Sequence, residues 1–234
     1  MSWHDGLCRG MIAAMITVVI PTLNAAEDLT RLLSRLTDAL VEEVIVADGG
    51  SLDETVEIAR KHGARVVVTA PGRGGQMAGG AAVARGDWLL FLHADSLLVP
   101  GWQAVVRAHQ QAAPDRALVF RLGFDDQSWK ARFLELVVRW RCRFLALPYG
   151  DQGLLISRRL YQALGGFKDM VLMEDVDIAR RLGRKRLVFS PHPLMTSARR
   201  YQTAGYGRRI LRNLFCLSLY FLGVSPQRIR KIYS

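Results

Sequence analysis

The chain has 234 residues, of which 50% are hydrophobic, so it is long and apolar enough for one large folded domain and unlike a disordered protein. The net charge of +11 comes from the C-terminal part, because thirteen lysine and arginine residues and no acidic residue follow Asp177. This asymmetry indicates an anionic partner, whether phosphate, nucleic acid or a membrane surface. The cysteines Cys8, Cys142 and Cys216 are too widely spaced for a metal motif or a disulfide framework, which favours a reduced cytoplasm.

The chain begins with a segment that we interpret as a leader outside the core. Residues 1–15 contain one arginine and an apolar run, but no small-residue cleavage site follows, so a signal peptide is not favoured. Met11 and Met15 are alternative start residues. The first strand is predicted over residues 16–20, a β-branched run that ends at Pro21.

Strands and helices then alternate along the first half of the chain. Ser51 and Glu54 have the spacing of a capping box, which predicts the start of a helix, and Gly63 predicts its end. Because short links join successive elements, the sequence predicts an α/β fold with a mostly parallel central sheet and right-handed crossovers. The expected elements are a helix over 27–40, a strand over 43–48, a helix ending at His62, and strands over 65–69 and 88–92.

The pattern changes after Pro100. The expected elements there are helices over 102–113, 128–147 and 174–182, a short helix to Leu164, and strands over 118–124 and 154–157. We expect residues 16–198 to form one domain and residues 199–234 to form a basic amphipathic helical segment. Its apolar stretch over 214–224 is too short to span a bilayer and fits a membrane interface, a helix packed on the domain or a homodimer contact.

Two of the predicted strands end in acidic residues. Asp48 follows the second strand, and the fourth strand runs into His93 and Asp95. Open α/β sheets bind ligands at the carboxyl ends of their strands, so Asp48 is a candidate for contacting a base or ribose. Asp95 is a candidate for a metal ion or phosphosugar, with His93 as a second ligand or an orienting group. The alternative for each acid is an ordinary turn residue.

The glycine-rich segment over 71–86 is a further candidate. It lacks the Walker A and dinucleotide-binding patterns, but it holds Arg73 and Gln76 among its glycines. An arginine at this place can bind a phosphate or a base edge. Composition alone favours the alternative, which is a mobile surface loop.

Three acids crowd the predicted start of the helix over 174–182. Acids at a helix N-terminus often only complement its dipole, but Glu174, Asp175 and Asp177 also repel one another, which can raise a carboxyl pKa toward general-base use. Asp175 and Asp177 lie roughly 200° apart around a helix, so one is expected to face a site and the other solvent. Glu174 is expected to point away from the position of Asp175.

The order of these features resembles glycosyltransferase family 2, whose members have the GT-A fold. The resemblance covers roughly residues 16–190. It rests on "PTLN" after the first strand, Asp48, the Arg/Gly segment, the acid after the fourth strand and the later "ED". The segments over 72–96 and 173–182 are most similar to a small bacterial subgroup that is associated with radical-SAM and selenium-domain proteins and linked to arsenosugar synthesis.

The resemblance implies a role for each candidate residue. It implies that Asp175 is the catalytic base of a single inverting displacement and that Asp95, with His93, holds a divalent metal ion, Mn²⁺ or Mg²⁺. The implied partners are a UDP- or GDP-sugar donor and an unidentified hydroxyl acceptor. The residues assigned to substrate binding are Pro21, Thr22, Glu27, Asp48, Arg73, Gln76, Asp151 and Glu174.

Two positions depart from the family pattern. Ala25 stands where most relatives have Glu, so one nucleotide contact is missing or is taken over by Glu27, and His93 replaces the first Asp of the Asp-X-Asp motif. The chemistry still fits, because a divalent ion at Asp95 would neutralise the departing diphosphate and a carboxylate across the cleft would take the acceptor proton.

Two alternative functions also fit parts of the sequence. A basic nucleic-acid-binding protein is disfavoured because the C-terminal tail lacks an RNA-binding motif and clustered aromatic residues, so no nucleic acid is expected as a partner. A nucleotidyltransferase on the same fold is disfavoured because "IPTLNAAED" lacks the expected lysine and G-x-G. We expect a cytoplasmic enzyme with a peripheral contact to the inner face of the membrane through its tail.

Overall fold

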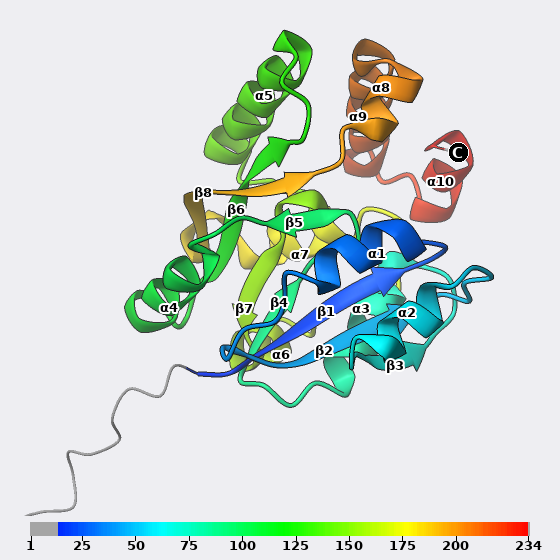
Figure 1. Cartoon of the computed structure of the whole chain (residues 1–234). Coiled ribbons are helices and arrows are strands. Elements are labelled where there is room, and N and C mark those ends of the chain that lie inside the picture. The colour runs from blue at the N-terminus through cyan, green and yellow to red at the C-terminus, as the bar shows by residue number, and fades with distance from the viewer. Residues whose placement is uncertain (1–13, 234) are drawn as a thin grey trace, which may run out of the picture.

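The computed structural model describes residues 14–233, and Figure 1 shows their helices around one sheet. The strands are β1 (Ile16–Thr22), β2 (Val41–Asp48), β3 (Arg65–Val68), β4 (Trp88–Phe91), β5 (Ser96–Leu98), β6 (Ala117–Phe124), β7 (Leu154–Ser157) and β8 (Leu187–Thr196). The α-helices are α1 (Ala26–Leu33), α2 (Thr55–Lys61), α3 (Arg73–Ala82), α4 (Trp102–Ala112), α5 (Trp129–Leu145), α6 (Arg158–Ala163), α7 (Glu174–Leu182), α8 (Arg199–Ala204), α9 (Tyr206–Phe221) and α10 (Pro226–Tyr233). Two 3₁₀ turns, η1 (Gly150–Gln152) and η2 (Arg184–Arg186), complete the described elements.

The strands form a single mixed sheet in the described part of the chain, in the order β3-β2-β1-β4-β7-β6-β8-β5. The strands β1 to β4 pair in parallel, as the β-α steps of the first half predicted. Strand β7 is antiparallel to both β4 and β6, β8 is parallel to β6, and β5 is antiparallel to β8 at the edge. The expectation of a mostly parallel sheet is confirmed, with β5 and β7 running against the other strands.

Helices cover both faces of the sheet, because residues of each strand alternate between two apolar clusters. On β1, Val18 faces a cluster that contains Leu29 of α1 and Val106 of α4. The next residue, Val19, faces a cluster that contains Met77 of α3 and Ile178 of α7. The result is a three-layer α/β unit, in which the carboxyl ends of β1, β2 and β4 lie along one edge.

The glycine-rich segment is a helix rather than the mobile loop that its composition alone favoured. Residues Arg73–Ala82 form α3, and its glycines allow close packing. A Cβ at Gly74 would lie 2.2 Å from the carbonyl oxygen of Lys168, and a Cβ at Gly80 would lie 2.5 Å from Cγ1 of Val19. Side chains at these positions would push α3 away from the sheet and from the segment that leads into α7.

The predicted helix over 27–40 is too long. Helix α1 ends at Leu33, and the chain then turns irregularly to β2. Leu36 and Leu40 are nevertheless buried, with exposed fractions of 4% and 1%. The spacing of the leucines therefore indicates burial against the sheet. Leu36 and Leu40 are buried by an irregular turn and not by a continued helix.

The predicted capping box at Ser51 and Glu54 does not form. Helix α2 begins at Thr55, and no side chain caps its N-terminus. The hydroxyl of Ser51 instead accepts a hydrogen bond from the amide of Asn24 and donates one to Asp48. Ser51 is used across the loops at the strand ends, so it is not available to the helix.

Most of the predicted leader, residues 1–15, lies outside the described residues. Its last two residues already contact the domain. Ala14 packs against the core and its carbonyl oxygen accepts a hydrogen bond from Gln110, and the carbonyl oxygen of Met15 accepts one from the amide of Trp88. Residues 14 and 15, the described part of this segment, therefore belong to the packed unit.

The C-terminal helices pack against the rest of the chain. Tyr201 of α8 joins an apolar cluster with α5 and β6, while Cys216 of α9 and Ile229 of α10 are buried in a second cluster with Val176 of α7. Of the alternatives for the tail, packing on the domain holds for this buried side. Within residues 14–233, no helix has the length and apolar character needed to cross a bilayer.

Candidate active site

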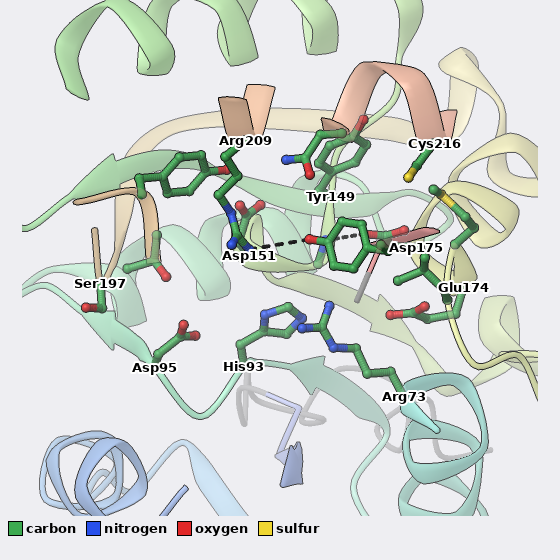
Figure 2. A pocket seen from close by; sticks show the side chains of 17 residues that line it. Arg73, His93, Asp95, Tyr149, Asp151, Glu174, Asp175, Ser197, Arg209 and Cys216 are labelled. Carbon is green, nitrogen blue, oxygen red and sulfur yellow. Dashed lines mark hydrogen bonds between the residues drawn. The ribbon is translucent and has the colours of Figure 1, made fainter. Parts of the chain in front are cut away.

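Two neighbouring pockets lie at the carboxyl ends of β1 and β4, and three side chains, those of Arg73, His93 and Asp95, line both. The strand-end pocket lies over the end of β1 and has a volume of about 990 Å³ counted out to bulk solvent. The acid pocket, drawn in Figure 2, has a volume of about 820 Å³ by the same measure. The shared residues make them two compartments of one cleft.

The strand-end pocket contains three of the residues predicted to bind substrate, Pro21, Thr22 and Gln76. Gln76 is buried, and its side-chain amide donates to the carbonyl oxygens of Thr22 at 2.7 Å and of Ala47 at 2.8 Å. Both amide hydrogens are therefore used in fastening β1 to β2 from α3. Gln76 holds the wall of the pocket and has no donor left for a substrate.

Asp48 organises the loop after β2. Its carboxylate accepts hydrogen bonds from the hydroxyls of Thr22 and Ser51 and from the amides of Gly50 and Ser51, at 2.5–3.0 Å. Burial raises the pKa of Asp48, but these hydrogen bonds outweigh it and hold the pKa below its usual value. Asp48 is only 1% exposed. It therefore lies behind the lining of the strand-end pocket and supports the loop there.

Glu27 lies outside both pockets. Its carboxylate is exposed and forms an ion pair with the guanidinium of Arg199 at 3.1 Å, which lowers the pKa of Glu27. This contact joins α1 to the C-terminal segment. In this conformation Glu27 does not supply the nucleotide contact that Ala25 lacks.

Asp95 and His93 occupy the turn after β4, and both line the two pockets. His93 lies under Gly150, since a Cβ at Gly150 would come within 2.5 Å of His93 Nε2. Within the described residues, no three His, Cys, Asp or Glu side chains are close enough together to hold a metal ion by themselves. An ion at Asp95 would therefore take most of its ligands from a bound diphosphate and water, as Mg²⁺ commonly does.

Glu174 faces the acid pocket, so the expectation that it points away is wrong. The residue before it, Met173, has a φ of 67°, a left-handed conformation that is rare for a residue with a side chain, and it starts α7 at the pocket. Glu174 is 1% exposed, and its Oε2 has no hydrogen-bond partner. Burial, reinforced by the charge of Asp175 and opposed by Arg73, raises the pKa of Glu174 to about 7.

Asp175 also lines the acid pocket, beside Glu174. Its Oδ2 accepts a hydrogen bond of 2.9 Å from the amide of Gly150, which fixes the carboxylate against the loop over His93. Asp177 is turned away and accepts hydrogen bonds from Lys168 at 3.0 Å and from Arg181 at 2.8 Å. Of the two aspartates, only Asp175 lies at the site, although Asp177 faces an ion-pair network rather than open solvent.

Asp151 is a fourth carboxylate of the acid pocket, after Asp95, Glu174 and Asp175, and it lies on the 3₁₀ turn η1. Its Oδ1 is buried without a hydrogen-bond partner. Burial raises the pKa of Asp151 to about 6; the charges of Asp175 and Asp95 add to the effect, while Arg141 and Arg73 oppose it. A carboxyl group in this state can bind a hydroxyl either as donor or as acceptor.

Arg73 connects the two pockets from the first turn of α3. Burial lowers the pKa of Arg73, but the nearby carboxylates of Glu174, Asp175 and Asp95 outweigh it, so the guanidinium stays charged. Figure 2 shows the Arg73 side chain on the same side of the space as His93 and Glu174. A fixed cation at this junction suits a phosphate group.

The C-terminal segment supplies pocket residues that the sequence did not reveal. These lining residues are Tyr201, Arg209, Asn213, Cys216 and Tyr233. The guanidinium of Arg209 lies 5.0 Å from the ring of Tyr201, and both Arg209 Nε and Asn213 Oδ1 are buried without a hydrogen-bond partner. Only the excess of basic residues hinted at them, since no motif singles out a residue of the tail.

Comparisons with known proteins agree with this geometry. The sequence profile described as "Glycosyl transferase family 2" matches residues 17–172. A PGL/p-HBAD biosynthesis glycosyltransferase of Mycobacterium bovis is 38% identical over 97 residues, which is 38% of this chain and 38% of that protein. A glucosyl-3-phosphoglycerate synthase of Mycobacterium tuberculosis is 37% identical over 112 residues, or 40% of this chain and 35% of that protein. The matched part is thus well under half of each of these relatives.

Solved structures share the fold over most of the chain. The crystal structure of glucosyl-3-phosphoglycerate synthase from M. tuberculosis with Mn²⁺, UDP and glucosyl-3-phosphoglycerate superposes with a TM-score of 0.59 at 23% identity, covering 91% of this chain and 85% of that one. The complex with Mn²⁺, UDP-glucose and glycerol 3-phosphate gives a TM-score of 0.60 at 22% identity. The likeness establishes the GT-A fold. Because the family profile spans most of the chain, the protein belongs to glycosyltransferase family 2.

Proposed function

We propose that this protein transfers a sugar from a nucleoside-diphosphate sugar to a hydroxyl acceptor, in a single displacement that inverts the anomeric carbon. The observation that carries the proposal is the pair of pockets that meet at Arg73 and Asp95. A diphosphate at this junction directs the sugar toward the acid pocket, where Asp175 lies. Membership of glycosyltransferase family 2 favours this function over a nucleotidyltransferase. It also favours it over a nucleic-acid-binding protein, for which the sequence lacks a motif.

The strand-end pocket is the proposed site of the nucleotide. Pro21 and Thr22 line it at the end of β1, and Arg73 offers a charged guanidinium where the pocket meets the acid pocket. Asp48 supports the loop on which the nucleotide would rest. The related synthase was crystallised with UDP and with UDP-glucose, which favours a UDP-sugar over a GDP-sugar as the donor.

We propose Asp95 as the principal protein ligand of a divalent ion, Mn²⁺ or Mg²⁺, with His93 beside it. Carboxylate oxygen is the ligand that these ions prefer, and Asp95 lines both pockets at the place where a diphosphate would lie. The related synthase was crystallised with each of the two ions. When bound, such an ion neutralises the negative charge of the departing diphosphate.

Asp175 is the proposed catalytic base. The acceptor oxygen attacks the anomeric carbon, the bond from that carbon to the diphosphate breaks, and the acceptor proton passes to the carboxylate of Asp175. The hydrogen bond from the Gly150 amide holds one of its oxygens in place for this transfer. Glu174, buried next to it with a raised pKa, is the second candidate for the same role.

We propose that the acceptor binds between the acid pocket and the C-terminal helices. Asp151, Arg209 and Asn213 each present a buried polar atom without a protein partner to this space. Unpaired buried polar atoms are costly, so their convergence favours a polar ligand with several hydroxyl or charged groups. The C-terminal segment would then be part of the enzyme rather than an appendage.

We also propose a cytoplasmic location with a peripheral membrane contact for the basic segment over 199–234. Its buried side packs on the domain through Cys216 and Ile229, which leaves its other side for such a contact. The same exposed side is available to a homodimer, which is the alternative.

Calorimetric titration with UDP and GDP, with and without Mn²⁺, tests the donor site. Asp95→Ala should lose the metal-dependent part of the affinity. Asp87→Ala, an exposed aspartate just before the opposite end of β4, is the matched control and should keep it. Unchanged metal dependence in Asp95→Ala would overturn the metal assignment, and failure of the wild-type protein to bind any nucleoside diphosphate would overturn the proposed function.

A further inference from the structure

The long helix α5 carries a row of large apolar side chains on its outer surface. Its buried side consists of Ala131, Leu134, Val138 and Cys142, which repeat every three or four residues. A second set repeats at the same spacing roughly 180° around the helix, at about 100° per residue. This outer row of α5 consists of Trp129, Phe133, Leu136, Val137, Trp140 and Phe144, with exposed fractions between 37% and 74%.

The neighbouring helix α9 also exposes apolar side chains. It buries Cys216 and Leu217 but leaves an exposed set that consists of Leu211, Leu214, Phe215 and Phe221. Figure 1 shows α5 and α9 rising above the same end of the sheet, and Ile210 of α9 packs in the cluster that holds the buried side of α5. Each of these helices thus exposes several large apolar side chains, and large exposed apolar surfaces on soluble proteins commonly bind a partner or a membrane.

Basic side chains flank the outer row of α5, and acids are almost absent. Lys130, Arg139 and Arg143 are exposed on α5. Its one acid, Glu135, is mostly buried and paired with Arg132 at 2.8 Å. The helices α8, α9 and α10 contain no acidic residue at all. Asp125 and Asp126 lie in the loop before α5, but lysine and arginine outnumber acids on α5 and α9, so the helices that carry the apolar side chains are net positive.

The positive charge around the outer row of α5 favours some binding partners over others. A second copy of the chain would bring one basic rim against another, which costs free energy through like-charge repulsion. An anionic lipid surface instead attracts each nearby lysine or arginine. Tryptophan rings such as those of Trp129 and Trp140 also prefer the boundary between lipid headgroups and acyl chains.

We propose that the outer row of α5, together with the exposed apolar side chains of α9, seats this protein on an anionic lipid bilayer. The proposal adds the aromatic surface of α5 to the contact suggested by the basic tail, and it does not depend on the glycosyl transfer proposed above. The chain passes from α5 into Tyr149 and Asp151 of the acid pocket, and α9 contributes Arg209 to the same pocket. Helix α9 therefore forms part of the wall of the site, and α5 leads into the loop that supplies Tyr149 and Asp151.

Co-sedimentation of the full-length protein with vesicles tests the proposal. Wild type should sediment with vesicles that mix phosphatidylcholine and phosphatidylglycerol, less so at high salt, and hardly at all with phosphatidylcholine alone. The double variant Phe133→Gln/Trp140→Gln should lose most of this binding. Leu52→Gln, which removes a 95% exposed leucine from a distant loop, is the matched control and should bind like wild type. Brominated lipids should quench the tryptophan fluorescence of wild type more than that of Trp140→Gln.

The outcomes separate the proposal from its rivals. The double variant changes only exposed side chains, so its thermal unfolding and its affinity for UDP should match those of wild type. A loss of vesicle binding can then be assigned to the α5 surface and not to misfolding or to the donor site. Equal sedimentation with neutral and anionic vesicles would overturn the electrostatic part of the proposal. A wild-type dimer in light scattering that becomes a monomer in the double variant, with no sedimentation of either, would show that the row binds a second copy instead.

Discussion

At the scale of single residues, two neighbouring carboxylates of the acid pocket have different surroundings. Asp175 is fixed by the amide of Gly150, while Glu174 is buried with an unpartnered oxygen. We predict that Asp175→Asn lowers turnover by roughly 10²–10⁴, the usual contribution of a positioned base, and leaves donor nucleotide binding intact. Sugar transfer, or slow hydrolysis of the nucleotide-sugar, measures the effect.

Asp177→Asn is the control for this prediction. Asp177 pairs with Lys168 and Arg181 outside the pocket, so its loss should lower the melting temperature and spare turnover. A dead Glu174→Gln beside an active Asp175→Asn would transfer the role of base to Glu174. An active Asp175→Asn and an inactive Asp177→Asn would contradict the assignment of Asp175 as the base and of Asp177 to a structural ion pair.

The buried carboxyl group of Glu174 also predicts a pH dependence of stability. Its pKa is raised from 4.5 to about 7 in the folded protein, so the folded state binds more protons than the unfolded state between these values. The free energy of unfolding should therefore fall as pH rises from 4.5 to 7, by up to about 3 kcal/mol. Glu174→Gln should remove the part of this fall that Glu174 contributes, and urea unfolding at pH 5 and at pH 8 measures it.

Glu57→Gln, which changes an exposed glutamate of α2, is the control for the pH experiment and should keep the wild-type slope. Asp151, with a pKa of about 6, contributes a smaller fall in the same direction, so the slope in Glu174→Gln should be reduced rather than abolished. A wild-type slope in Glu174→Gln would show that another group titrates in this range.

At the scale of elements, the position of α3 depends on glycines that admit backbone from other segments. Gly74→Ala would set a Cβ 2.2 Å from the carbonyl oxygen of Lys168 and 2.8 Å from the amide nitrogen of Met170, and neither atom can move alone. We predict a loss of stability of about 1–3 kcal/mol, as is typical of overpacking, together with weaker donor binding because Arg73 adjoins the displaced turn. Chemical unfolding and UDP titration measure both effects.

Gly75→Ala is the matched control on the same helix. Its Cβ would meet the carboxylate of Asp169 at 2.7 Å, the end of a flexible side chain that can rotate away. Alanine favours helix over glycine by about 1 kcal/mol, so the variant should be neutral or slightly stabilised. Equal destabilisation by both substitutions would mean that α3 does not depend on close approach at Gly74.

At the scale of the whole molecule, the C-terminal segment completes both pockets. Arg230 of α10 lines the strand-end pocket, far along the chain from the residues of β1 that it faces. We predict that Arg230→Gln weakens UDP binding roughly threefold to tenfold, the effect of losing an exposed charge contact worth about 1 kcal/mol. Arg228→Gln, an exposed neighbour on the same helix outside the pocket, should leave the affinity unchanged in the same titration.

The sequence predicted several features of the site because their chemistry is local. Asp95 follows a hydrophobic strand, and Asp175 starts a helix with a recognisable "ED" pair, so their residue types and neighbours carry the signal. Glu174 was misplaced because its direction depends on the left-handed conformation of Met173, which no sequence pattern indicates. Gln76 was assigned to substrate although its amide is used by two backbone carbonyls from other strands.

The sequence by itself determined the alternation of strands and helices, the carboxylates at the strand ends and the membership of the family, because these depend on periodicity and short spacing. Tertiary structure alone decided that the glycine-rich segment is a packed helix, that His93 lies under Gly150 and that Arg209 reaches the acid pocket. Each of these facts joins residues that are far apart in the chain. Their contacts follow from how helices and strands pack, and a linear pattern of residue types carries no record of that packing.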